Sequence, residues 1–274
     1  MEPEIYETRA QWLAARRRGV GASDVPAIVG VSPHGSALSV WIDKTRPREE
    51  EDTEVLSYGR EMEAAIIARF ARESGKCVKS HPLALWRSER WGWMFCTPDA
   101  WCCDENAGVE AKTLMPYGWD EELPGSWELQ AHAQMAVMGW DRVYIPTYDG
   151  GRRWHVFTVE RDEEAIEEIA QLTKSFWEMV TSGTMPEPGH LDAQALAKYF
   201  PPVDAVMVLS EEDVATIERI KGLAMIKDIY EEELETAKNR LRARLGSATA
   251  GEKDGLLLVT WRADSRGRRV LRII

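Results

Sequence analysis

The 274-residue sequence contains no run of about 18 consecutive apolar residues, the length that a membrane-spanning helix requires. Its N-terminal stretch MEPEIYETRA is acidic and lacks the apolar segment of a secretory signal. With 44% apolar and 29% charged residues, the chain has enough apolar side chains for a core and is not disordered by composition. We therefore expect a soluble, cytoplasmic protein without membrane contacts.

Cysteine is scarce, and the four residues of this type show no CxxC pair: Cys77, Cys96, Cys102 and Cys103. Without such a pair, a structural zinc site is not expected. Cys102 and Cys103 would point to opposite faces of a strand, which is a poor start for a shared metal site. The pattern predicts buried, free thiols.

Positive charge is also in short supply, because 46 acidic side chains against 34 basic ones give a net charge of −12. This balance argues against a protein that coats nucleic acid indiscriminately. It does not exclude a nuclease, since metal sites need carboxylates and one local basic patch can hold a phosphate. Residues 191–274 carry 14 acidic and 14 basic side chains, so the excess lies in residues 1–190.

The run GTMPEPGH at residues 183–190 combines Gly and Pro and predicts a boundary between a domain at 1–188 and an extension at 189–274. Within the domain, we expect strands at 77–86, 92–103, 108–114, 141–149 and 152–160, and helices that include 125–139 and 162–181. In the extension, Ser210 and Asp213 indicate a capping box for a long helix over 211–245, followed by a basic hairpin.

One motif carries the chemistry. Thr97-Pro98-Asp99 is followed after ten residues by Glu110-Ala111-Lys112. Side chains alternate along a strand, so Glu110 and Lys112 should share a face, and a turn within the gap can bring Asp99 beside Glu110. Two carboxylates at that separation make a hard-oxygen site for Mg²⁺, to which the Ala111 carbonyl can add a ligand.

Lys112 makes this pattern one for hydrolysis rather than for metal storage. Its ammonium can hold the attacking water or offset the charge that builds up in a phosphorane-like transition state. Taken alone, the pattern has only moderate specificity, because exposed strands and turns often carry Asp, Glu and Lys.

Three further segments accompany the motif. Glu63 lies beside the predicted buried helical stripe of Met62 and Ile66. The expected helix at 125–139 carries three polar residues at alternate positions: Gln130, His132 and Gln134. A basic run leads into a glycine-containing loop and a helix start, which together are suited to holding a phosphate: Arg16, Arg17, Gly19, Gly21 and Ser23.

With these segments in view, residues 9 to about 188 resemble the YqaJ-type viral recombinase family, relatives of phage lambda exonuclease. The matching stretches are RRRGVGASDVPAIVGVSP, WIDKT, YGREMEA, CTPDAW, GVEAKT, QAHAQMAVMG and VERDEE. The resemblance implies an α/β (α+β) fold with a PD-(D/E)xK, restriction-endonuclease-like core, a mixed central sheet flanked by helices, here with a C-terminal long helix and β-hairpin.

The resemblance also implies an activity: Mg²⁺- or Mn²⁺-dependent digestion of linear duplex DNA, typically 5′→3′, for phage recombination in a bacterial or phage-infected cell. By position, Glu63, Asp99 and Glu110 match the family's metal-site acids, and Lys112 matches its catalytic lysine. Arg16 and Ser23 fall where the family contacts the DNA 5′-phosphate. A single-strand annealing protein is an expected partner, and family members can form ring-shaped trimers.

One position departs from the family, whose helix motif is Q-x-Q-x-Q, whereas this chain has His132 in the middle. Two other functions remain open at this point. A structure- or end-selective endonuclease would use the same core chemistry. A catalytically silent DNA-end-binding scaffold would have no reason to keep all four of Glu63, Asp99, Glu110 and Lys112. Iron–sulfur nucleases of this superfamily need a cysteine set that the tail lacks.

Overall fold

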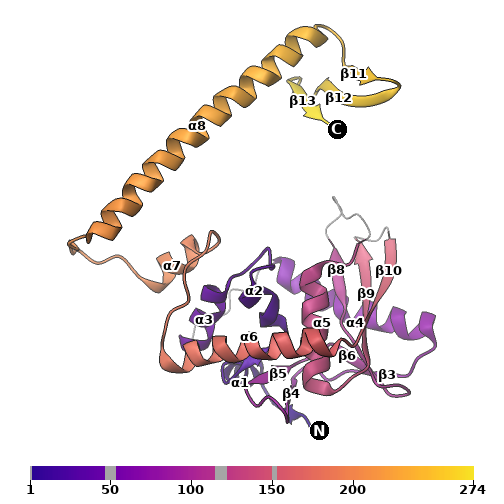
Figure 1. Cartoon of the computed structure of the whole chain (residues 1–274). Helices are drawn as coiled ribbons and strands as arrows, with labels where there is room; N and C mark the ends of the chain where they lie inside the picture. Colours follow the sequence, from indigo (N-terminus) through magenta and orange to yellow (C-terminus); the bar gives the residue numbers. More distant parts are fainter. Residues whose placement is uncertain (1, 47–53, 115–121, 150–152) are drawn as a thin grey trace. The chain divides into compact units, whose positions relative to one another are not determined.

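The structure, a computed structural model, describes residues 2–46, 54–114, 122–149 and 153–274 (Figure 1). It consists of two compact units, residues 1–202 and residues 203–274. None of the described helices is long and apolar enough to cross a membrane.

The larger sheet of the first unit is mixed and has the strand order β10-β9-β7-β6-β3, with β8 also beside β9. Strands β7 and β8 run parallel to β9, whereas the other neighbours are antiparallel. The strands are β3 (Val78–Lys79), β6 (Ala100–Cys102), β7 (Ala107–Val109), β8 (Lys112–Leu114), β9 (Arg142–Asp149) and β10 (Arg153–Glu160).

A smaller sheet has the order β1-β4-β5-β2, formed by β1 (Glu4–Ile5), β4 (Ala84–Arg87), β5 (Met94–Cys96) and β2 (Val20–Gly21). The sequence predicts single strands over 77–86, 92–103 and 108–114, and the structure splits each of them in two. The first two splits divide the strand between the two sheets. Pro98, which has no backbone N–H to donate, lies in the break between β5 and β6.

The helices begin and end largely where the sequence predicts. Thr8 and Ser36 cap α1 and α3 through their side chains, and Gly139 ends α5 in the left-handed conformation at φ 70°. The helices are α1 (Arg9–Arg16), α2 (Val25–Val29), α3 (Ala37–Thr45), α4 (Glu54–Ser74), α5 (Gly125–Met138), α6 (Glu163–Ser182) and α7 (Ala193–Tyr199), and a 3₁₀ turn (Ala22–Asp24) precedes α2.

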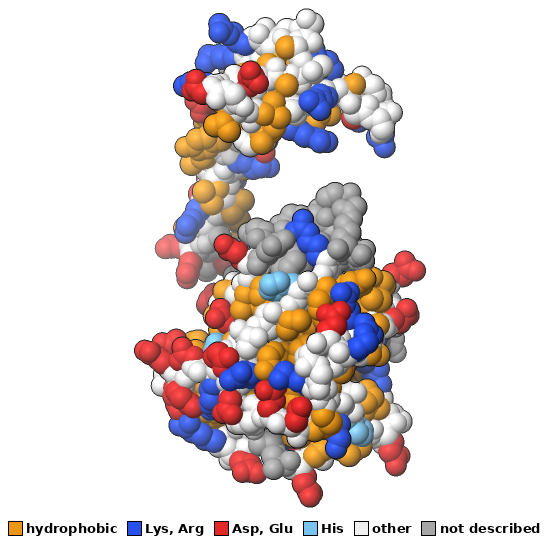
Figure 2. Space-filling view, turned by 90° about the vertical axis from the view of Figure 1, so that its right-hand side faces the viewer, with side chains coloured by type: hydrophobic (Ala, Val, Ile, Leu, Met, Phe, Trp, Pro, Cys, Tyr) orange, Lys and Arg blue, Asp and Glu red, His pale blue; other side chains and the backbone are white. Residues whose placement is uncertain are grey.

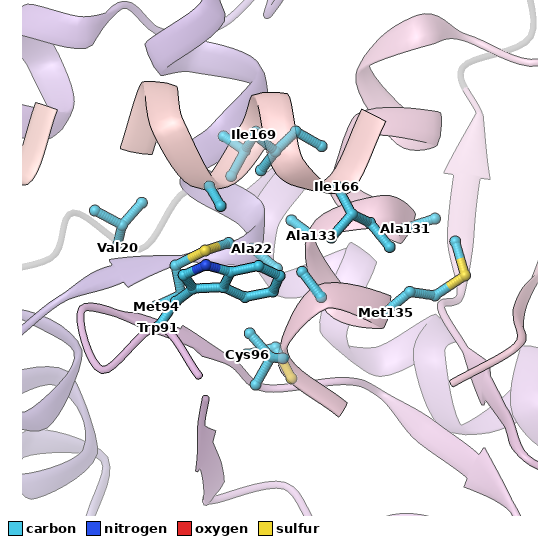
Figure 3. Packing of buried hydrophobic residues seen from close by; sticks show 14 of the residues in the cluster. Val20, Ala22, Trp91, Met94, Cys96, Ala131, Ala133, Met135, Ile166 and Ile169 are labelled. Atoms are coloured by element: carbon cyan, nitrogen blue, oxygen red, sulfur yellow. The ribbon is translucent and has the colours of Figure 1, made fainter. Parts of the chain in front are cut away.

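Helices α4 and α5 cover opposite faces of the larger sheet. Tyr144 of β9 packs with Phe70 of α4, whereas Val143 and Ile145 face the main core around α5. Successive side chains of a strand point to opposite faces, so this alternation places one helix on each side. In the main core, Ile166 and Ile169 of α6 pack over the small residues of α5 (Figure 3).

Helix α7 belongs to the first unit, which therefore extends past residue 188, where the sequence predicts a domain boundary. The Ser36 hydroxyl donates to the carboxylate of Asp192, which is 1% exposed, and the ring of Tyr199 lies 5.6 Å from that of Trp41. These contacts tie residues 192–199 to α3. Whether residues 189–274 form a functionally separate extension stays a prediction.

The second unit contains α8 (Glu211–Leu245) and a sheet of β11 (Ala250–Lys253), β12 (Leu256–Ala263) and β13 (Arg269–Ile273). The expected capping box is present, since Asp213 N donates to Ser210 Oγ and Ser210 N donates to Asp213 Oδ2. A Cβ at Gly251 would lie 2.9 Å from Cγ1 of Val259, the residue opposite it on β12, so β11 needs glycine at this position. The long helix and the hairpin are thus both confirmed.

The cysteines differ in part from the expectation of buried thiols. All four are free, and Cys96 and Cys102 are buried, but Cys77 and Cys103 are exposed. The last two flank the short paired segments of β3 and β6 at the end of the sheet, where little covers them.

Candidate active site

The predicted motif lies in the interior of the larger sheet, where β6 begins and β7 is followed by β8. Strands β6 and β7 pair antiparallel with Ala100 opposite Val109, and continuing this register places Asp99 opposite Glu110. The Asp99 carboxylate accepts a hydrogen bond of 2.8 Å from the Ala111 backbone N–H. The structure therefore brings Asp99 beside the Glu110-Ala111-Lys112 segment, as the ten-residue spacing predicts.

Glu110 is the hub of this cluster. Its carboxylate, only 6% exposed, accepts hydrogen bonds from Lys112 Nζ at 2.9 Å, from Gln130 Nε2 at 2.6 Å and from Gln134 Nε2 at 2.6 Å. Lys112 Nζ also donates to Gln130 Oε1 at 2.9 Å. The Lys112 ammonium is thus hydrogen-bonded both to the Glu110 carboxylate and to the Gln130 amide, which is itself bonded to Glu110. These bonds hold the ammonium in one position.

The charges of the cluster shift one another's proton affinity. Burial raises the pKa of the Asp99 carboxyl well above its usual range, and the negative charges of Glu110 and Glu63 raise it further. Burial also raises the pKa of Glu63, to which the charge of Glu110 adds. Glu63 lies on α4 and thus approaches from another element than the strands that carry Asp99 and Glu110. The negative charge of these three carboxyl groups is therefore only partly balanced by nearby positive charge.

Lys112 responds in the opposite sense. Burial favours its neutral amine, but the charges of Glu110 and Asp99 outweigh that effect and raise the pKa of its ammonium. The side chain is therefore a cation throughout the neutral range, not a proton acceptor.

Helix α5 does not bring all three of its predicted polar residues to the site. Gln130 and Gln134 are four positions apart, so they share a face, whereas His132 lies about 200° around the helix from Gln130. The charged groups that affect His132 are Glu128, Asp162 and Arg161, not the acids of the cluster. Alternate spacing suits a strand, and on this helix it separates the middle residue from its neighbours.

The His132 side chain is 6% exposed, and its Nδ1 has no hydrogen-bond partner within the described parts of the chain. Burial lowers its pKa, so the imidazole is neutral. A core packing residue fits these properties better than a group that contacts substrate.

The donor set fits a hard divalent cation such as Mg²⁺. Within the described residues, no group of three His, Cys, Asp or Glu side chains is arranged to hold a metal, so the chain forms no complete protein cage. Mg²⁺ does not require one, because it binds through one or two carboxylates and keeps several waters. Asp99 and Glu110 supply such carboxylates. Burial and then the charges of Glu110 and Glu63 raise the pKa of Asp99, and a cation would offset those charges.

The predicted phosphate-binding segment lies close to the segment that carries Asp99. Arg16 donates from Nη2 to Ser23 Oγ at 2.9 Å and from Nη1 to Thr97 Oγ1 at 2.8 Å. Thr97 is two residues before Asp99, so Arg16 connects the Ser23 loop to the carboxylate cluster. Arg17 is half-buried on the same helix end.

Sequence reasoning missed Lys44, which organises this loop. Its ammonium is 2.6 Å from Asp24 Oδ2 and donates to the Arg16 carbonyl at 3.0 Å. Although Asp24 is buried, the positive charges of Lys44 and Arg16 lower its pKa. Lys44 lies in the WIDKT stretch, and a lysine within an otherwise apolar helix face was the available signal.

In the second unit, one face of the Trp261 ring is covered by an arginine side chain. The Arg269 guanidinium lies 3.6 Å from the Trp261 ring centroid and donates to the carbonyls of Gly246, Ala248 and Trp261. The covered ring face belongs to the unit's own packing. Arg262 and Arg272 are on neighbouring strands and two residues apart in register, since Arg272 pairs with Thr260 and Val270 with Arg262.

The chain is similar to known proteins in sequence and in fold. Residues 11–141 match the YqaJ-like viral recombinase domain. The chain is 30% identical over 202 residues to the uncharacterized protein YqaJ of Bacillus subtilis, an alignment that covers 70% of this chain and 62% of that protein. The chain thus spans less than two thirds of the length of this relative.

Two solved structures share the fold: an alkaline exonuclease, LHK-Exo, from Laribacter hongkongensis, and LHK-Exo in complex with dAMP. Their TM-scores are 0.54 and 0.55 at 20% identity, and the matches cover 70% and 69% of this chain and 100% and 99% of theirs. The mixed sheet flanked by helices that the resemblance implies is therefore confirmed. Over residues 11–141, the chain is similar to the YqaJ-like viral recombinase domain family.

Proposed function

We propose that this chain is a Mg²⁺-dependent deoxyribonuclease that digests linear duplex DNA from its ends, in the 5′→3′ direction, with Mn²⁺ as a substitute metal. One observation carries the proposal: the Lys112 ammonium is held 2.9 Å from Glu110, and Asp99 lies opposite Glu110 on the neighbouring strand. The fold shared with LHK-Exo, named an alkaline exonuclease, supports the same activity.

Asp99 and Glu110 would hold the metal through their carboxylates, together with the Ala111 carbonyl and with Glu63 from α4. When bound, Mg²⁺ supplies positive charge at the scissile phosphate and lowers the pKa of a bound water. Gln130 and Gln134 hold the Glu110 carboxylate in one orientation. This restraint keeps the acids in position before substrate arrives.

Lys112 acts as a fixed cation. Because its pKa is raised, it does not take a proton from water at neutral pH; it donates hydrogen bonds to the attacking water or to a phosphate oxygen. As negative charge builds up on the phosphorus centre, a preorganised ammonium stabilises the transition state more than the ground state.

The terminal phosphate of the DNA would bind at Arg16, Arg17 and Ser23. Arg16 is already oriented by Ser23 and Thr97, so its guanidinium loses little conformational freedom on binding. A 5′-phosphate held there lies next to the segment that carries Asp99, which places the first phosphodiester bonds near the carboxylates. End binding of this kind favours an exonuclease over an endonuclease.

One assay separates this function from its alternatives. Linear and covalently closed circular duplexes are incubated with the protein, each with Mg²⁺ and with EDTA. We expect loss of the linear duplex in Mg²⁺ alone, faster with a 5′-phosphate than with a 5′-hydroxyl, and a smaller preference in Arg16→Ala. Cleavage of the circle would indicate an endonuclease, and binding of ends without cleavage would indicate a silent scaffold.

The resemblance also supports two assemblies: a ring-shaped homotrimer around DNA, and a complex with a single-strand annealing protein. Light scattering of the purified chain tests the first. Co-elution with a candidate annealing protein tests the second. A monomer at micromolar concentration would contradict the ring.

A further inference from the structure

A groove runs along the sheet-facing flank of α4. It consists of two cavities, of about 460 Å³ and about 330 Å³, that share Glu73 and Trp154 in their walls. Together they extend from Met62, next to the metal-site candidate Glu63, to Lys76 just beyond the helix end. At about 1.5 Å per helical residue, this is a length of about 20 Å. All the lining residues belong to the first unit.

One wall of the groove is aromatic. Tyr144 and Tyr148 are four positions apart on β9, so their side chains lie on the same face of the sheet, and Trp154 pairs with Tyr148 across the β9–β10 ladder. The rings of Tyr148 and Trp154 meet edge to face at 6.3 Å. All three side chains are half-buried, so part of each ring remains accessible.

The other wall is basic. Arg69 and Arg72 are three residues apart on α4, and Lys76 follows just beyond the end of this helix. Arg69 lies 4.4 Å from the Trp154 ring centroid, and Lys76 lies 5.1 Å from that of Tyr144. On this side of the first unit, Lys and Arg side chains are interspersed with hydrophobic ones (Figure 2).

Existing ion pairs do not close the groove. Arg69 pairs with Glu73, whose side chain is 43% exposed, and Lys76 pairs with Glu105. Ion pairs that remain partly open to solvent contribute little to stability, so a phosphate can replace the carboxylate at little cost. Arg72 is exposed at the mouth of the larger cavity.

We propose that this groove binds single-stranded DNA, with bases stacked on Trp154 and the two tyrosines and phosphates held by Arg69, Arg72 and Lys76. Aromatic platforms alternating with cations are the chemistry that holds a single strand without sequence preference. The length of two adjoining cavities suits several nucleotides rather than one. A duplex, whose bases are already stacked and paired, offers no ring faces to these side chains.

The inference rests on the proposed function, because digestion of one strand of a duplex leaves the other as a single strand. Met62 lines the groove next to Glu63, and Tyr148 pairs with Thr113, which follows Lys112. The groove thus begins at the segment of α4 that carries Glu63, on the face of the sheet opposite to Gln130 and Gln134. It would receive the strand that is not cut.

The test is a fluorescence anisotropy titration of a labelled oligothymidylate with the full chain, in EDTA and at low salt so that nothing is cleaved. We expect binding to weaken about tenfold or more in Trp154→Ala and in Arg69→Ala/Arg72→Ala. Arg90→Ala is the matched control, because Arg90 lies 4.3 Å from the Trp91 ring centroid, in the same Arg-on-Trp arrangement outside the groove. This variant should bind as the wild type does.

Arg72→Glu separates loss of binding from loss of folding, because this exposed side chain can change without disturbing the core. The variant should bind the oligonucleotide more weakly while its melting temperature is unchanged. Wild-type affinity in all groove variants, or no binding by the wild type, would overturn the inference. Competition by free dTMP at the same concentration of nucleotide would also overturn it in favour of a mononucleotide site. Oligonucleotide binding through the groove by a protein that digests no DNA would instead refute the proposed nuclease.

Discussion

At the scale of single residues, the site depends on the different environments of two carboxylates. Glu110 accepts hydrogen bonds from one ammonium and two amides, whereas Asp99 accepts a backbone N–H and faces the charges of Glu110 and Glu63. Asp99 is therefore the acid whose ionisation costs the metal-free protein most. The proposed metal binding needs that charge, whereas folding does not.

Asp99→Asn should therefore stabilise the metal-free protein while abolishing cleavage. The pKa of Asp99 is raised in the folded state, so the stability linked to its proton is fully present below the unfolded value, about 4, and is lost as the pH rises through the folded pKa. We expect a higher melting temperature for the variant at neutral pH in EDTA, with the difference vanishing near pH 4. Equal melting curves at both pH values would contradict this assignment.

Lys112→Ala should lower the cleavage rate by at least about a hundredfold, the scale of losing one preorganised electrostatic contact. Because Asp99 and Glu110 remain, Mg²⁺ binding measured by calorimetry should be retained or strengthened. Loss of metal affinity instead would mean that Lys112 maintains the structure of the site rather than its chemistry.

At the scale of elements, much of the site was predictable because strand geometry is simple. The ten residues between Asp99 and Glu110 leave room for one turn, and alternation along the strand places Glu110 and Lys112 together. The polar face of α5 was predictable only in part. Gln130 and Gln134 share a face at i and i+4, whereas His132 lies on another side of the helix, so its role at the site stays a prediction.

Other features of the fold were not readable from the sequence. The divisions of 77–86 and 92–103 between two sheets depend on which strands pair, and short apolar runs do not encode their partners. Lys44 was missed because its role requires Asp24 and the Arg16 carbonyl, both far from it along the chain. Residues 150–152, where the strands expected at 141–149 and 152–160 meet, lie outside the described residues.

Helix α5 yields a paired prediction. Gln134→Ala removes one donor from the buried Glu110 carboxylate, which should cost about 1–3 kcal/mol of stability and lower activity. His132→Gln, which restores the family's motif, should leave the cleavage rate within about threefold, because position 132 faces away from Glu110. A large rate change in His132→Gln alone would show that this residue reaches the substrate.

At the scale of the whole molecule, the boundary between the two units lies after Pro202, so α7 belongs with the nuclease candidate. A chain that ends at Pro202 should keep the melting temperature of the first unit. A chain that ends at His190 loses the Asp192 and Tyr199 contacts and should melt about 5–10 °C lower, which calorimetry can measure. Equal stability of the two truncated chains would place the structural boundary earlier.

The central claim is that the site formed by Asp99, Glu110 and Lys112 hydrolyses DNA. Its most direct test is the release of acid-soluble nucleotides from a linear, 5′-phosphorylated duplex in Mg²⁺, measured for the wild type and for Asp99→Asn side by side. We expect steady release by the wild type and none by the variant, although the variant is folded. Equal release by both proteins would contradict the claim.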